Sequence, residues 1–120
     1  MNFFQWLMRR RSVRGVGLSF YKRGLTRATK HDQKGAMEDY TAAIDLQDAP
    51  ADVRAMALYN RALLHVAAKH FPKAIHDLNA VLAIAAPLRK IKSAARQKLD
   101  RMQHSHQTNA AVRPNVVMST

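Results

Sequence analysis

The sequence contains no cysteine, which excludes a disulfide framework, a thiolate metal site and a cysteine nucleophile. Glycine and proline are scarce, at four residues each in 120, and aromatic residues make up only 7% of the chain. Collagen-like and disordered chains are rich in glycine or proline, so this composition is that of a folded globular domain. Alanine, leucine, arginine, lysine and glutamine recur instead, and these residues favour helices. The sequence therefore predicts one all-α domain.

Acidic residues are absent from the first 31 positions, which contain eight lysines and arginines. Residues 87–120 hold seven basic residues and one acidic residue, whereas residues 32–86 hold five basic and seven acidic residues. The net charge of +12 therefore comes from the two ends of the chain. Such ends predict contact with an anionic membrane surface, nucleic acid or an acidic protein. The predicted contact residues are Arg9, Arg10, Arg11, Arg14, Arg89, Lys92 and Arg96.

Long apolar runs are missing, so the sequence predicts no membrane-spanning segment. In a helix near the start of the chain, one face is apolar, with Trp6 at its margin and arginines after it; the face consists of Phe3, Phe4, Leu7 and Met8. Residues 1–16 therefore form a predicted basic amphipathic segment. Three roles remain open for this segment: a cap that packs on the rest of the protein, a membrane-surface anchor and a targeting peptide. We expect a cytoplasmic protein, peripheral to a membrane if the segment is an anchor.

No motif for catalysis or metal binding stands out. No serine lies in a Gly-x-Ser-x-Gly turn, and no pair of carboxylates is placed for acid–base work. His65, His70 and His76 are five and six residues apart, whereas a spacing of four would place two ligands on one helical face. We therefore predict that the protein is not an enzyme, with no catalytic residues, metal site or cofactor.

The sequence repeats itself at a shift of 38 residues, with residues 19–44 matching residues 57–82. Six of the 26 aligned pairs are identical, where chance gives about one or two. The identical pairs are Tyr21 and Tyr59, Arg23 and Arg61, Leu25 and Leu63, Ala36 and Ala74, Asp39 and Asp77, and Ala42 and Ala80. In each unit, apolar residues at helical spacing are interrupted by a short break, so each unit predicts two helices joined by a turn.

The two repeats are predicted at about residues 17–50 and 55–87, and a further helix at 88–102. In that helix, Leu88, Ile91, Ala95, Leu99 and Met102 form an apolar stripe among basic residues. The stripe indicates a closing helix that covers the second repeat, so that the helical domain spans residues 17–103. Residues 104–120 show no sustained period and are predicted to be a flexible tail.

Each unit has large and small residues at fixed positions. These positions correspond to the spacing W-x2-L-G-x2-Y in the first helix of the unit and A-x3-F in the second. The matching residues are Phe20, Gly24, Ala36 and Tyr40 in the first unit, and Leu58, Ala62, Ala74 and Leu78 in the second. This pattern resembles that of tetratricopeptide repeats. The chain departs from it at Arg27 and His65, which stand at the tyrosine position, and in a connection between units about four residues longer than usual.

The resemblance implies a superhelix of two helical hairpins that binds other proteins without catalysis. The expected function is that of an adaptor or scaffold holding a peptide or a partner protein in a groove lined by the first helix of each repeat. The residues that the resemblance places in this groove are Tyr21, Leu25, Thr29, Tyr59, Asn60 and Leu63. The alternative function is peripheral binding of an anionic membrane or nucleic acid through the basic ends. Because two repeats are few for a stable array, self-association into a homo-oligomer is a further expectation.

Overall fold

The computed structural model describes the backbone of residues 2–118 and the side chains of residues 2–7 and 12–105. The described part is all-helical and contains no strand, so the prediction of an all-α chain is confirmed. Its five helices are α1 (Phe3–Thr29), α2 (Gln33–Asp45), α3 (Ala51–Ala67), α4 (Phe71–Ala83) and α5 (Arg89–Met118).

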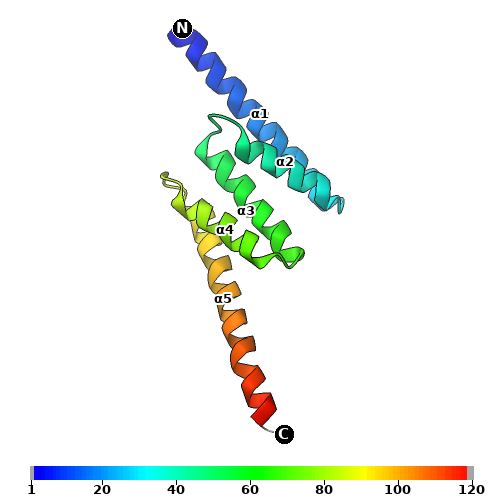
Figure 1. Cartoon of the computed structure of the whole chain (residues 1–120). Helices are drawn as coiled ribbons and strands as arrows, with labels where there is room; N and C mark the ends of the chain where they lie inside the picture. Colours follow the sequence, from blue (N-terminus) through cyan, green and yellow to red (C-terminus); the bar gives the residue numbers. More distant parts are fainter. Residues whose placement is uncertain (1, 119–120) are drawn as a thin grey trace.

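The helices follow one another along an elongated molecule of 74 × 31 × 18 Å, with the two termini at opposite ends (Figure 1). We call the pair α1 and α2 hairpin 1, and the pair α3 and α4 hairpin 2. Each helix packs on the next one in the chain, and α1 also contacts α3 while α3 contacts α5. Within the described residues, α2 and α4 do not contact each other. The odd-numbered helices therefore touch in series along the array.

The turns inside the two hairpins have the same backbone geometry. His31 and Lys69 lie 38 residues apart, and both adopt the left-handed conformation, with φ of 63° and 62°. A residue in the left-handed conformation commonly ends a helix, because the N–H groups that follow can then donate hydrogen bonds to the last carbonyls of the helix. Accordingly, the N–H of His70, which follows Lys69, donates to the carbonyl of His65 at 2.8 Å. The repeat predicted from the sequence is thus also a repeat of backbone structure.

Each hairpin has its own apolar core, completed by an alanine from the next odd-numbered helix. The core of hairpin 1 is built on Ala36, Tyr40 and Ala43 of α2 and takes Ala57 from α3. The core of hairpin 2 takes Ala95 and Leu99 from α5, which is the closing role predicted for that helix. Its other buried members are Ala55, Leu58, Ala62, Ala74, Leu78 and Val81. Ala57 and Ala95 are themselves 38 residues apart, so α5 meets hairpin 2 as α3 meets hairpin 1.

The helix boundaries differ from the prediction at both ends of the chain. One continuous α1 replaces the separate segment 1–16 and first repeat helix, because Gly15 and Gly17 both keep negative φ and do not break the helix. At the other end, α5 runs on to Met118 through the residues predicted as a tail. The rings of Phe3 and Phe4 are not covered by the hairpins, since Phe3 is 74% exposed and Phe4 is 67% exposed. The part of α1 before residue 14 therefore extends beyond the two hairpins as an arm (Figure 1).

A close approach inside hairpin 1 explains a difference between the repeats. A Cβ atom on Gly24 would lie 2.6 Å from the ring of Tyr40, which is too close for any real contact. At the matching positions, hairpin 2 has Ala62 and the smaller Leu78. Tyrosine in α2 therefore requires glycine in α1, whereas leucine in α4 permits alanine in α3.

We predict that Gly24→Ala lowers the free energy of unfolding by about 1–3 kcal/mol, because the new methyl group forces the Tyr40 ring from its packed position. Adding Tyr40→Leu, which copies hairpin 2, should make the loss smaller than the sum of the two single changes. Urea unfolding measures all three variants. Gly15→Ala is the control: no atom lies within 4 Å of its new Cβ, so we expect it to stabilise the helix by about 0.5–1 kcal/mol. Equal losses for Gly24→Ala and Gly15→Ala would contradict the prediction.

Candidate functional site

A buried aspartate joins the two helices of each hairpin. Asp39 of α2 and Asp77 of α4 are both 2% exposed, and each is bound by an arginine sixteen residues earlier. Arg23 donates to the two oxygens of Asp39 at 3.0 and 2.8 Å, and Arg61 donates to those of Asp77 at 2.8 Å each. Two parallel hydrogen bonds between charged groups are among the strongest side-chain contacts in proteins.

A second cation or potential cation approaches each aspartate, and here the two hairpins differ. In hairpin 1, Arg27 reaches Asp39 at 3.1 Å and also lies 3.9 Å from Asp32. In hairpin 2 the matching residue is His65, whose Nε2 lies 3.7 Å from Asp77. The imidazole is shorter than an arginine side chain and does not fill the same space.

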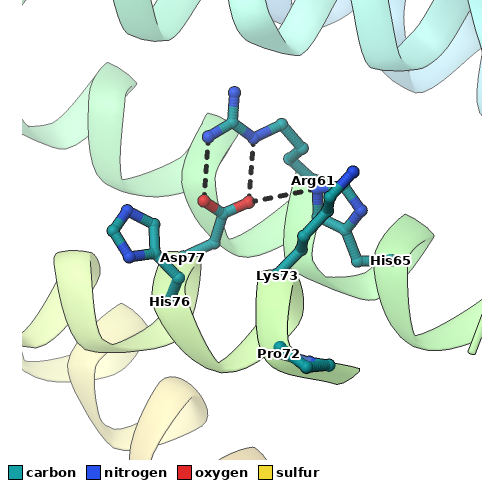
Figure 2. A pocket seen from close by; sticks show the side chains of 6 residues that line it. All are labelled: Arg61, His65, Pro72, Lys73, His76 and Asp77. Carbon is teal, nitrogen blue, oxygen red and sulfur yellow. Dashed lines mark hydrogen bonds and ion pairs between the residues drawn. The ribbon is translucent and has the colours of Figure 1, made fainter. Parts of the chain in front are cut away.

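A pocket opens beside the Asp77 carboxylate at this position. Its volume is about 310 Å³, and Figure 2 shows His76 and Lys73 on either side of the carboxylate with Pro72 below it. The residues that line the pocket are Arg61, His65, Pro72, Lys73, His76 and Asp77. Arg61 is held at the back by its two bonds to Asp77 and by a third, from Nη1 to the Thr41 hydroxyl at 3.1 Å. We call this group the hairpin 2 pocket.

The pocket combines a neutralised carboxylate with basic groups. The hydrogen bonds to Asp77 raise the pKa of Arg61, so this guanidinium stays charged. Burial lowers the pKa of His65, whose side chain is 12% exposed, so its ring is mainly neutral at pH 7. The Nδ1 atom of His65 is buried and has no hydrogen-bond partner among the described residues. Asp77 is the one acidic residue among those that line the pocket, and Arg61 already binds both of its oxygens, so no second carboxylate there neutralises Lys73.

The structure brings only part of the predicted groove together. Asn60 of α3 donates from Nδ2 to the Tyr21 hydroxyl at 3.3 Å and to the Met56 carbonyl at 2.9 Å. The Tyr21 ring also lies 6.2 Å from that of Tyr40, and burial raises the pKa of Tyr21. These contacts make Tyr21 and Asn60 a link between α1 and α3.

The other predicted groove residues have different surroundings. Leu25 packs partly on the core of hairpin 1, and Tyr59 packs partly on the core of hairpin 2. Thr29 is exposed, with its hydroxyl bound to the Thr26 carbonyl at 2.7 Å. Leu63 is half-buried and belongs to neither core cluster. Leu63 is thus the apolar residue of this set with the weakest role in the fold.

The predicted anion-contact residues also divide into two groups. Arg14 pairs with Asp52 of α3 through two hydrogen bonds of 3.0 and 2.9 Å, and Lys92 donates to the carbonyl of Ile84, so the fold itself engages both charges. Arg89 and Arg96 are exposed on α5. Arg9, Arg10 and Arg11 lie on the arm of α1, but their side chains fall outside the described residues.

Sequence reasoning missed the hairpin 2 pocket, although one signal for it was present. The identities of Arg23 with Arg61 and of Asp39 with Asp77 place charged residues among the small and apolar residues that pack the hairpins. A repeated arginine and aspartate at a constant separation of sixteen indicates an ion pair between two neighbouring helices. The sequence pattern places His65 at the tyrosine position of the repeat, and neither this pattern nor the histidine spacing connects His65 and His76 with Lys73.

The described helices include none that is long and apolar enough to cross a membrane. Among the same residues, no group of three or more histidine or acidic side chains is placed to hold a metal ion. Comparison of the chain with protein-family models, with curated proteins and with solved structures finds no match. Any statement about function therefore depends on the chain itself.

The two arginine–aspartate pairs should differ in how much stability depends on the first arginine. We predict that Arg61→Met lowers the free energy of unfolding by about 3–5 kcal/mol, because it removes both short hydrogen bonds from the buried Asp77 and leaves only the His65 ring, 3.7 Å away, beside it. Arg23→Met should cost less, because Arg27 still pairs with Asp39. Urea unfolding of both variants measures the difference. A larger loss for Arg23→Met would show that the second cation does not stabilise the buried aspartate.

Proposed function

We propose that the chain is a non-catalytic protein-interaction module of the tetratricopeptide type, which holds a peptide or partner protein against the odd-numbered helices. The observation that carries this proposal is the order of contacts. Within the described residues, α1, α3 and α5 touch in series while α2 and α4 do not touch. In a superhelix of helical hairpins, the first helices form the inner surface by this same arrangement.

The composition of the inner surface supports a protein ligand. Two tyrosines and two leucines of the predicted groove lie on α1 and α3 at matching positions. Tyrosine provides a large contact area at low entropic cost and a hydroxyl for the partner's backbone. Leu63 is half-buried and outside both cores, so its side chain is available to a ligand.

We predict that peptides selected on the full chain from a random displayed library bind in this groove. Leu63→Lys should weaken their binding about tenfold, because a charged ammonium replaces an apolar contact. Val16→Lys is the matched control: Val16 is 41% exposed and lies on the opposite side of α1 from Tyr21, so affinity should not change. Fluorescence anisotropy of the selected peptides measures both variants. Equal binding by the two variants, or binding lost between about 50 and 200 mM salt, would contradict the groove proposal.

The arm of α1 supports a second candidate function, which is attachment to an anionic membrane surface. Phe3, Phe4 and Trp6 are 74%, 67% and 43% exposed, and three arginines follow them in the sequence. Exposed aromatic rings next to basic residues are typical of helices that lie in a membrane interface.

We predict that the full chain sediments with vesicles that contain phosphatidylserine, and much less with neutral vesicles. Changing Phe3, Phe4 and Trp6 to alanine should reduce binding at least about tenfold, because each ring buries apolar area in the interface. Phe71→Ala is the control, since this exposed phenylalanine lies on α4, far along the chain from the arm. Sedimentation that is equal for all three proteins would show that the arm is not an anchor.

A further inference from the structure

The hairpin 2 pocket exists because hairpin 2 lacks the long side chain that fills the matching place in hairpin 1. Arg27 occupies that place, with its Nη1 atom on Asp39 and its Cδ atom beside Gly35. His65 stands at the same position in hairpin 2 and leaves about 310 Å³ open next to Asp77. The space that Arg27 fills in hairpin 1 is therefore open in hairpin 2.

The charges around this place also change between the hairpins. Hairpin 1 has Asp32, Gly35 and Glu38 where hairpin 2 has His70, Lys73 and His76. Two acidic residues are thus replaced by histidines, and a glycine is replaced by a lysine. Hairpin 1 also has Lys34 where hairpin 2 has Pro72, so the difference comes from the loss of acidic residues. Hairpin 1 has Asp32, Glu38 and Asp39 around this place, whereas hairpin 2 has only Asp77, which is already bound to Arg61.

The first turn of α4 lacks an acceptor that α2 has. In hairpin 1 the carboxylate of Asp32 accepts a hydrogen bond from the Gly35 N–H at 2.9 Å. His70 makes no such bond at the start of α4, and Pro72 and Lys73 in the first turn of that helix line the pocket. An anion in the pocket would supply the negative charge that the positive end of this helix favours.

We propose that the hairpin 2 pocket binds a phosphate group. A carboxylate is best recognised by a free guanidinium fork, but both donors on that edge of Arg61 are used by Asp77. The groups that remain are the Lys73 ammonium, the His76 ring and the start of α4, which approach from different directions. Such separate donors suit the tetrahedral oxygens of phosphate better than a planar carboxylate.

This site is separate from the proposed groove. At about 100° per residue, Arg61 and His65 lie on the side of α3 opposite to Tyr59 and Leu63. A phosphate could therefore be bound while the groove holds a peptide, and either proposal can fail without the other. Two sources of phosphate fit the pocket: the free ion and a phosphorylated side chain.

The test is a titration of inorganic phosphate into the full chain at pH 7, followed by amide and histidine-ring NMR signals, with total ionic strength held constant by chloride. We expect saturable shifts centred on His65, Lys73 and His76. The double variant Lys73→Gly with His76→Glu installs the residues of hairpin 1 and should weaken binding about tenfold. Both residues are exposed, so the fold should be retained, and circular dichroism checks this. Lys34→Ala, at the start of α2, is the matched control and should bind like the unchanged chain.

A second variant tests the pocket without removing a charge. His65→Arg should fill the space as Arg27 does in hairpin 1 and abolish the saturable shifts, although the chain then carries more positive charge. Tighter phosphate binding by His65→Arg would overturn the proposal, as would shifts spread without saturation over the basic ends of the chain. Titrations of O-phosphoserine and of acetate into the unchanged chain identify the kind of anion.

Tighter binding of O-phosphoserine than of inorganic phosphate supports a phosphorylated side chain as the source, and the reverse order supports the free ion. Acetate binding as tight as phosphate would contradict a phosphate site.

Discussion

The two helices of each hairpin are held in one register by a buried aspartate. A carboxylate that is 2% exposed has lost nearly all of its water, and removing its partner leaves an uncompensated charge. Only a helix offset that brings the arginine into two-bond contact satisfies Asp39 or Asp77. Apolar contacts alone would tolerate small shifts along the helix axis, whereas two parallel hydrogen bonds of about 3 Å do not. The spacing of sixteen between arginine and aspartate in both hairpins thus fixes which turns of the two helices face each other.

The same pair explains why one substitution produces a pocket rather than a collapsed hairpin. Arg61 already neutralises Asp77 and binds Thr41, so the second cation is not needed to keep the carboxylate charged. The position can then change from the long Arg27 to the shorter His65 while α3 and α4 keep their register. Loss of the first arginine would have no such freedom, because the histidine beside it is mainly neutral. Both hairpins therefore keep the same internal arginine–aspartate pair, while the residues around that pair differ between them.

The sequence predicted the helical class and the repeat because both depend on local patterns. The spacing of apolar residues predicted α2, α3 and α4. Identical small residues at matching positions, such as Ala36 and Ala74, predicted that the two helices of each hairpin pack closely. It did not predict a continuous α1, because Gly15 and Gly17 weaken a helix locally while contacts elsewhere decide whether it continues. Gly17 is buried, and a Cβ atom there would lie 3.3 Å from Val53 of α3, so packing on α3 sets this stretch. The pocket depends on side chains from two helices, α3 and α4, and no single-helix pattern contains it.

Several positions at which α3 packs on the hairpins differ in polarity from the matching positions of α1 and α5. At the position of Ala57, which is buried against hairpin 1, α1 has the exposed Ser19, and at the position of Leu64 it has the exposed Thr26. These two positions of α1 are therefore polar where the matching positions of α3 are apolar. On the other side, α5 keeps Ala95 against hairpin 2 but has the exposed Arg96 where α3 has the core residue Leu58. A second helix cannot pack on α5 there without burying that guanidinium. Polar residues at these positions suit surfaces that face water, whereas the inner surface, the arm and the hairpin 2 pocket combine apolar or charged groups that a ligand can contact.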